Sequence, residues 1–126
     1  MNGRIVHFEI PFDDGDRARS FYADVFGWTT QEMPEMQYTM AVTGPTGDDG
    51  MPSEPGFING GMFQREDTLN VPMLTINVGS IEEALGKVEA SGGTKVQDKQ
   101  PVGEMGFVAY VNDSEGNLVG LWENAG

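Results

Sequence analysis

The chain contains a single histidine, His7, which lies in the alternating segment RIVHFEIPF. Glu9 follows two residues later, and in an extended strand this spacing places both side chains on one face, roughly 7 Å apart. An imidazole with an ordinary pKa can bind a metal ion, transfer a proton at neutral pH or anchor a ligand by a hydrogen bond. Both residues also have a purely structural interpretation. His7 can be a buried imidazole that forms a hydrogen bond with a neighbouring residue, and Glu9 can form an ion pair with a nearby arginine. The sequence leaves these interpretations open.

The size and composition of the chain suit one small globular domain over residues 1–126. Of its 126 residues, 38% are hydrophobic, and a chain of this size can bury a core without disulfides or structural metals. There is no cysteine, so disulfides and thiolate metal sites are excluded. We find no leader sequence and no apolar run long enough to span a membrane, and therefore expect a cytoplasmic protein with no membrane partner.

The charge of the chain is strongly acidic. Seven Lys and Arg residues stand against twenty Asp and Glu residues, which gives a formal net charge of −13. Nucleic-acid binding needs cationic side chains for the phosphates, so this balance argues against it. The acids are scattered along the chain, which is typical of a solvated acidic surface such as a high-salt cytoplasm favours. A cationic ligand is the alternative explanation.

The first half of the chain predicts one strand, one helix and three more strands. Residues 4–12 alternate between apolar and polar side chains, as a half-buried strand does. A helix is expected next, with Asp13 or Asp14 as its N-cap and Gly27 at its C-terminal end. Its apolar residues follow the spacing of a buried stripe: Ala18, Phe21, Tyr22 and Val25. The later strands are expected at residues 29–33, 36–43 and 57–64, and a Gly- and Pro-rich loop at residues 44–56.

The second half repeats this order with an offset of 73 − 7 = 66 residues. Residues 71–78 alternate, Ser80 and Glu83 form a capping box, and Gly92 or Gly93 ends the helix that follows. Further strands are expected at residues 94–101, 106–111 and 118–123. Each helix can cover the apolar face of its own strands. The opposite faces, which carry His7 and Glu9 in the first half, are then expected to curve around a hollow.

Four segments in this order resemble the vicinal oxygen chelate superfamily, which includes glyoxalase I, bleomycin-resistance proteins and extradiol dioxygenases. They are the opening HFEI, the helix end SFYADVFGW, GGMF at the close of the first half and DSEGNLVGLWE at the close of the second. The resemblance implies an α+β fold of two βαβββ modules in tandem, at residues 4–64 and 71–124. It also implies that the modules form a cup-shaped half-barrel around a small-molecule site.

The resemblance further implies a divalent ion held by a histidine on the first strand of each module and a carboxylate on the last. His7 occupies the first position, but its counterpart in the second half is Met73, a soft thioether ligand. The carboxylate positions fall on Gly60 and Gly120, and Glu123 is expected to point to the opposite face of its strand. We therefore predict no metal and no other cofactor. A divalent metal is the alternative, should the strand register differ.

Three functions follow as hypotheses, because the fold alone does not choose among them. The first is a metal-free protein that binds a small molecule. The acidic charge of the chain would favour a cationic ligand. The second is a metal-dependent lyase or dioxygenase related to glyoxalase I, and the third is a metal-free acid/base enzyme that uses His7 and Glu9 as catalytic groups. A homodimer is expected in each case. The predicted ligand-binding residues are His7, Glu9, Met62, Met73, Thr75 and Trp122.

Overall fold

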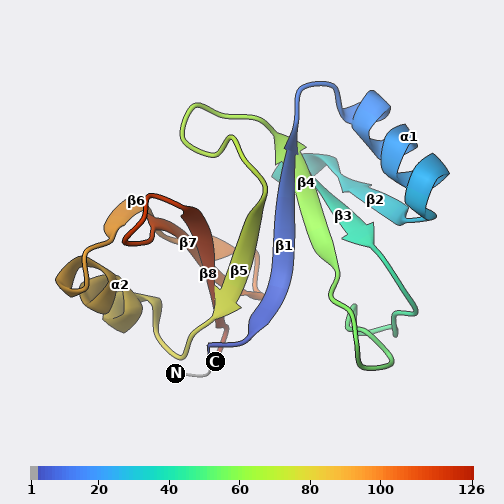
Figure 1. Cartoon of the computed structure of the whole chain (residues 1–126). Coiled ribbons are helices and arrows are strands. Elements are labelled where there is room, and N and C mark those ends of the chain that lie inside the picture. The colour runs from blue at the N-terminus through green and yellow to red at the C-terminus, as the bar shows by residue number, and fades with distance from the viewer. Residues whose placement is uncertain (1–2) are drawn as a thin grey trace. The chain divides into compact units, whose positions relative to one another are not determined.

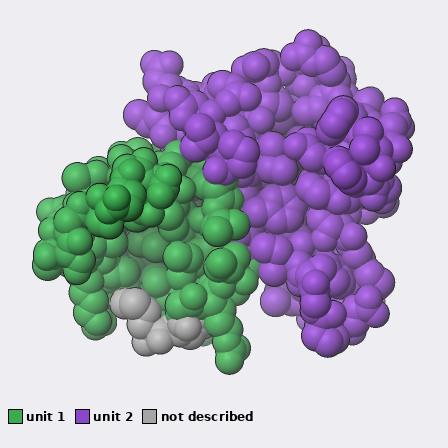
Figure 2. Space-filling model, in the orientation of Figure 1, with its two compact units in different colours: residues 1–6, 73–126 green, residues 7–72 purple. Residues whose placement is uncertain are grey.

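The computed structural model describes residues 3–126 and divides into two compact units. Unit 1 comprises Met1–Val6 and Met73–Gly126, and unit 2 comprises His7–Pro72 (Figure 2). The boundary falls within the first strand, Ile5–Phe12, and the two residues before this strand bond to Asn77 of the same unit. The amide of Asn77 donates to the carbonyl of Arg4, and the amide of Gly3 donates to the carbonyl of Asn77. The expectation of a single domain over residues 1–126 stays a prediction.

The elements of the first half follow the predicted order of strand, helix and three strands (Figure 1). Strand β1 pairs in parallel with β4, and β3 lies antiparallel between β4 and β2, so the strand order is β2-β3-β4-β1. The 3₁₀ turn η1 shortens the strand expected from residue 36. The bounds are β1 Ile5–Phe12, α1 Gly15–Phe26, β2 Thr29–Met33, η1 Pro34–Met36, β3 Tyr38–Val42 and β4 Gly60–Gln64.

The elements of the second half repeat this topology. Strand β5 pairs in parallel with β8, and β7 lies antiparallel between β8 and β6, which gives the order β5-β8-β7-β6. The bounds are β5 Met73–Asn77, α2 Ile81–Ala90, β6 Thr94–Val102, β7 Gly106–Asn112 and β8 Leu118–Asn124. The α+β fold of two βαβββ modules is therefore confirmed. Within residues 3–126 no helix is both long and apolar enough to cross a membrane.

Helix α2 covers one face of the unit 1 strands and forms the main core with them. Ser80 caps the helix by accepting the amide of Glu83, as the capping-box pattern predicts. Ile81 is fully buried and Leu85 nearly so, because they lie on the helix face that contacts β7 and β8. The buried members of this cluster are Val78, Ile81, Ala84, Leu85, Ala109, Val111 and Leu121.

Helix α1 begins and ends where the sequence predicts, but its expected apolar stripe is wrong. Asp14 accepts the amide of Arg17, and Gly27 adopts the left-handed conformation at φ 76°. No residue of α1 is buried, and Phe21 and Val25 are more than half exposed.

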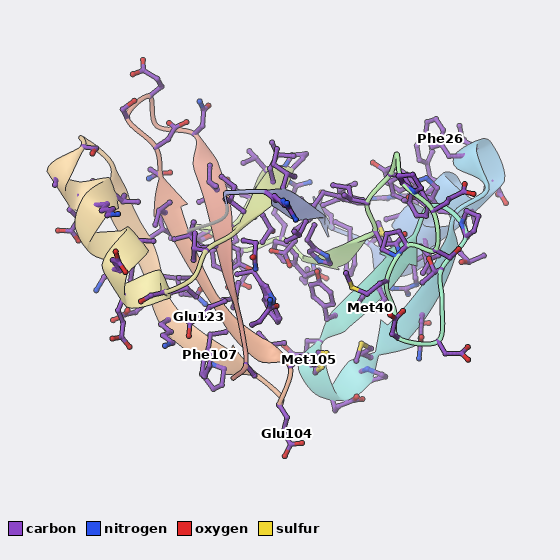
Figure 3. The ribbon with its side chains drawn as sticks, turned by 90° about the horizontal axis from the view of Figure 1, so that it is seen from below. Phe26, Met40, Glu104, Met105, Phe107 and Glu123 are labelled. Carbon is purple, nitrogen blue, oxygen red and sulfur yellow. The ribbon has the colours of Figure 1, made fainter. Side chains whose placement is uncertain are left out.

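The reason is that Arg19 lies between α1 and the strands. Its guanidinium lies 5.9 Å from the centre of the Phe12 ring, donates to Thr39 and pairs with Glu32 at 3.5 Å. Of the predicted stripe, Tyr22 is half-buried and stacks on Trp28, whereas Phe21 and Val25 face away from the sheet. Figure 3 shows Phe26, in the last turn of the helix, projecting outward.

Candidate functional site

The strand pairings sort the residues of each half-sheet onto two faces. One face, the helix side, contacts the helix of its own unit, and we call the other the distal face. In unit 2, Glu9 pairs with Gly61, and Gly61 pairs with Met40, so these three residues share the distal face. By alternation and pairing along the strands, the other distal residues of unit 2 are His7, Pro11, Thr29, Gln31, Met33, Tyr38, Val42 and Phe63. The prediction that His7 and Glu9 lie together, away from the helix side, is confirmed.

His7 forms a hydrogen bond with Tyr38 on this face. The imidazole Nε2 lies 2.7 Å from the phenolic oxygen, and the two rings are nearly parallel, with centroids 6.4 Å apart. Burial lowers the pKa of His7 from 6.5 to about 4, because desolvation disfavours the charged form. His7 is therefore neutral at pH 7, and the His7–Tyr38 pair, hereafter the dyad, carries no charge. Glu9, only 6% exposed, lies two residues away on the same strand.

The dyad depends on the glycine at position 61. A Cβ built there would lie 1.7 Å from the phenolic oxygen of Tyr38, so any side chain would displace the phenol. Tyr38 was not among the site residues predicted from the sequence. The alternation of residues 38, 40 and 42 places it on a strand face, but no sequence pattern indicates that it reaches His7 across β4.

The register of β4 corrects two of the predicted positions. Met62 pairs with Ile10 and Thr39 on the helix side and is fully buried, so it is a core residue and not a ligand-binding one. Gly60 also lies on the helix side, where a Cβ would meet the Phe8 ring at 2.5 Å. The error is a shift of one residue in the GGMF segment, which exchanges the two faces of the strand.

Gly61, and not Gly60, is therefore the counterpart of Gly120. In unit 1 Thr75 pairs with Gly120, just as Glu9 pairs with Gly61 in unit 2. Met73, Thr75 and Trp122 all lie on the distal face of unit 1, as their strand alternation predicts. Their distal neighbours on β5, β7 and β8 include Asn77, Val108, Tyr110, Asn112, Leu118 and Asn124. Whether these residues bind a ligand stays a prediction.

Thr75 has a buried hydroxyl with no hydrogen-bond partner among the described residues. The residue is 3% exposed, and its Oγ1 lies 3.0 Å from the point where a Cβ would stand on Gly120. The indole nitrogen of Trp122 donates to Asn124 at 2.8 Å, so this tryptophan offers its ring and not its N–H to the face.

Glu123 lies on the helix side, as the sequence predicts, and not on the distal face. Its carboxylate accepts the amide of Ile81 at the N-terminus of α2 at 2.8 Å and approaches Lys99 at 3.4 Å. The bond from Ile81 is the main cause that lowers the pKa of this carboxyl, and Lys99 adds to it. Glu123 and Phe107, which pairs with it on β7, are labelled in Figure 3. Glu123 therefore caps a helix.

The residues do not fit the metal centre that the superfamily typically holds. Its four ligand positions carry His7, Gly61, Met73 and Gly120, which supply one ordinary ligand. That imidazole is already bonded to Tyr38 through Nε2. Over residues 3–126 no group of three or more His, Cys, Asp or Glu side chains could hold an ion. Catalytic zinc needs about three protein ligands, and magnesium needs oxygen ligands. Correcting Gly60 to Gly61 changes nothing here, because neither has a side chain.

Comparison with known proteins agrees with this fold. The family described as "Bleomycin resistance protein-like N-terminal" matches residues 4–44. Lactoylglutathione lyase of Haemophilus influenzae is 30% identical over 125 residues, which cover 96% of this chain and 93% of the relative. A probable lactoylglutathione lyase of Vibrio parahaemolyticus is 30% identical over 129 residues, which cover 98% and 92%.

Solved structures show the same fold at lower sequence identity. A methylmalonyl-CoA epimerase of Streptomyces coelicolor in complex with 2-nitronate-propionyl-CoA has a TM-score of 0.65 and 19% identity, and the match covers 100% of both chains. A hypothetical protein of Bacillus halodurans C-125 has a TM-score of 0.65 and 15% identity, over 100% of this chain and 97% of the other. Together with the relatives of 30% identity over nearly the whole chain, these likenesses place the protein: it belongs to the vicinal oxygen chelate superfamily, the group of glyoxalase I and the bleomycin-resistance proteins.

Proposed function

We propose that the chain binds a neutral or cationic small molecule on the distal faces of its modules and that it does so without a divalent ion. The observation that carries this proposal is the set of residues at the superfamily's ligand positions. One histidine, one methionine and two glycines cannot replace two histidines and two carboxylates. The proposed ligand-binding residues are His7, Glu9, Tyr38, Met73, Thr75 and Trp122.

The dyad supports the binding of an uncharged polar group in unit 2. A phenol and a neutral imidazole can donate and accept hydrogen bonds, but they offer no full charge to a ligand. A histidine with a pKa of about 4 is also a weak base at neutral pH. The pair is therefore better suited to hold a ligand than to abstract a proton, which favours binding over acid/base catalysis by His7 and Glu9.

The positions and ion pairs of the lysine and arginine side chains support a ligand that carries no negative charge. Within residues 3–126, ion pairs with acids hold Arg19, Arg65, Lys87, Lys95 and Lys99. The distal positions identified above include no lysine or arginine. Glutathione and coenzyme A carry carboxylates or phosphates, which proteins normally hold with such cations. The ligands named for the relatives and for the epimerase complex therefore suit this chain poorly.

The second candidate is a metal-dependent lyase, which the likeness to lactoylglutathione lyases favours. The two functions differ in metal content. We expect mildly purified protein to carry less than about 0.1 equivalent of zinc, nickel, iron or manganese, and EDTA to leave its melting temperature unchanged. A stoichiometric metal whose removal lowers the melting temperature would replace the binding proposal with the lyase.

The charge of the ligand can be tested with three compounds of one shape: benzamide, benzoate and benzamidine, which are neutral, anionic and cationic at pH 7. The chain has one histidine, so its imidazole C–H resonances report on the dyad without assignment. We expect benzamide or benzamidine to shift these resonances in a saturable manner and benzoate to leave them in place. The Tyr38→Phe variant should weaken the response. Binding of benzoate alone would contradict the proposed charge class.

A further inference from the structure

We propose that Thr75 and Gly120 form a ligand subsite on the distal face of unit 1, where the Thr75 hydroxyl bonds a neutral oxygen of the bound molecule. This inference rests on the proposed function and gives it a chemical class: a carbonyl, carboxamide or hydroxyl group attached to a planar, apolar body.

The first observation is the buried hydroxyl itself. Polar atoms in protein interiors almost always have a partner, and an unsatisfied one costs stability. Thr75 Oγ1 has none among residues 3–126, although its side chain is almost completely buried. A valine would fill the same space without this cost. We therefore expect the Thr75 hydroxyl to form a hydrogen bond with a group from outside residues 3–126.

The second observation is the glycine beside it. Thr75 and Gly120 are paired across β5 and β8, and the hydroxyl lies 3.0 Å from the position that a Cβ of residue 120 would take. The nearest carbon of Tyr110 lies at 3.5 Å from the same point. Because residue 120 is a glycine, no side chain at this position lies against the hydroxyl.

Comparison of the two units shows what fills such a position. In unit 2 the equivalent glycine is Gly61, and the phenolic oxygen of Tyr38 occupies the space of its missing side chain. That oxygen is bonded to His7, so the position in unit 2 is satisfied internally. At Gly120 the nearest described atom is the Thr75 hydroxyl oxygen itself, 3.0 Å from the Cβ position, and this hydroxyl has no hydrogen-bond partner within residues 3–126. We assign the missing oxygen in unit 1 to a ligand.

The surroundings indicate the chemistry of that ligand. The distal residues around Thr75 are a thioether, two aromatic rings and amides: Met73, Tyr110, Trp122, Asn77 and Asn112. None of them is charged, so a bare carboxylate or ammonium would lose its hydration without a counter-charge. Aromatic and methionine side chains instead suit a flat apolar body. A neutral aromatic amide such as benzamide has both features.

The test uses benzamide and a chain in which Trp122 is the only tryptophan. Trp28, which stacks on Tyr22 in unit 2, is replaced by Phe in every protein compared. In this background Trp122 fluorescence reports binding on the distal face of unit 1. We expect Thr75→Val to weaken benzamide binding about three- to tenfold, which is the effect of one lost neutral hydrogen bond. Thr75→Ser should keep the affinity within about twofold, because it keeps the hydroxyl.

Gly120→Ala provides an independent variant, since its methyl group would stand against the hydroxyl and exclude the ligand oxygen. It should weaken binding at least as much as Thr75→Val does. Two matched controls lie on exposed positions of the same unit. Thr94→Val removes a hydroxyl from β6, and Gly86→Ala adds a methyl group on α2 where nothing lies within 4 Å. Both should bind benzamide as the parent does.

The melting temperature of the ligand-free proteins distinguishes a subsite from a structural hydroxyl. Thr75→Val should melt at the same temperature as the parent or higher, because it removes an unsatisfied buried group. A lower melting temperature would overturn the inference, since the hydroxyl would then have a structural partner. Unchanged benzamide affinity in Thr75→Val, or no binding to the parent, would overturn it as well. The metal-free proposal is judged separately by metal content and by the chelator.

Discussion

His7 has one property that reaches beyond its contact with Tyr38: burial keeps it neutral in the folded chain. Its folded pKa is about 4, whereas an unfolded chain would give it a pKa near 6.5. Between these two values the unfolded state binds the proton and the folded state does not. Stability must therefore fall as the pH is lowered from about 6.5 towards 4, and it is unaffected by this group above about 7.

We predict that the wild-type chain loses about 2 kcal/mol more unfolding free energy between pH 7 and pH 5 than His7→Gln does. Glutamine cannot titrate, so it lacks this source of pH dependence. The carboxyls with lowered pKa values, such as Asp113 and Glu123, titrate below this range and do not obscure the difference. Urea titrations at the two pH values measure it. Equal losses in both chains would mean that His7 is not held neutral by burial.

The site residues show what the sequence can and cannot predict at this scale. Alternation along a strand was enough to place His7 beside Glu9, and Thr75 on the distal face. It failed for Met62, because the pair of glycines before it gives no side-chain pattern from which to fix the register. The bond between Tyr38 and His7, and the lack of a partner for the Thr75 hydroxyl within residues 3–126, both depend on which strands lie side by side. Contacts between strands leave no local signal in the sequence.

The two helices have the same apolar spacing but different roles. Ile81, Ala84 and Leu85 of α2 are buried against β7 and β8, whereas no residue of α1 is buried. The sequence therefore predicted the existence, caps and period of both helices, but not the burial of α1. The reason is Arg19. Its side chain pairs with Asp16 and Glu32 and lies over the Phe12 ring, so a charged residue stands where an apolar helix face would pack on the sheet. Periodicity shows that a helix has an apolar face, not that this face is covered.

We predict that Leu85→Ala lowers the unfolding free energy by about 2–4 kcal/mol, because it leaves a cavity in the unit 1 core. Val25→Ala, on the exposed face of α1, should change it by less than about 0.5 kcal/mol. Both substitutions shorten an aliphatic side chain on a helix, so chemical denaturation of the two variants compares burial directly. A large loss in Val25→Ala would indicate that the face of α1 is covered in solution.

At the scale of the whole molecule, the duplication was the most informative feature of the sequence. An offset of 66 residues between two strand–helix–strand patterns predicted two modules of one topology, and the structure has both. The expected homodimer stays a prediction. It follows from the resemblance to the superfamily and from the strand at residues 94–101, whose outer edge would otherwise be left open. Strand β6 carries Lys95, Lys99 and Pro101, and its pairing with β7 is interrupted twice. These features discourage strand addition at an edge.

The uncovered face of α1 has a consequence for the colloidal behaviour of the protein. Phe21, Val25 and Phe26 are each more than half exposed, while a net charge of −13 keeps neighbouring molecules apart. Added salt shortens the range of that repulsion from about 10 Å at 0.1 M to about 3 Å at 1 M, and it does not weaken apolar contact. We expect light scattering to show more dimer at 1 M than at 0.05 M sodium chloride, and Phe26→Ser to remove the increase. A molar mass independent of salt would mean that this helix face stays in water.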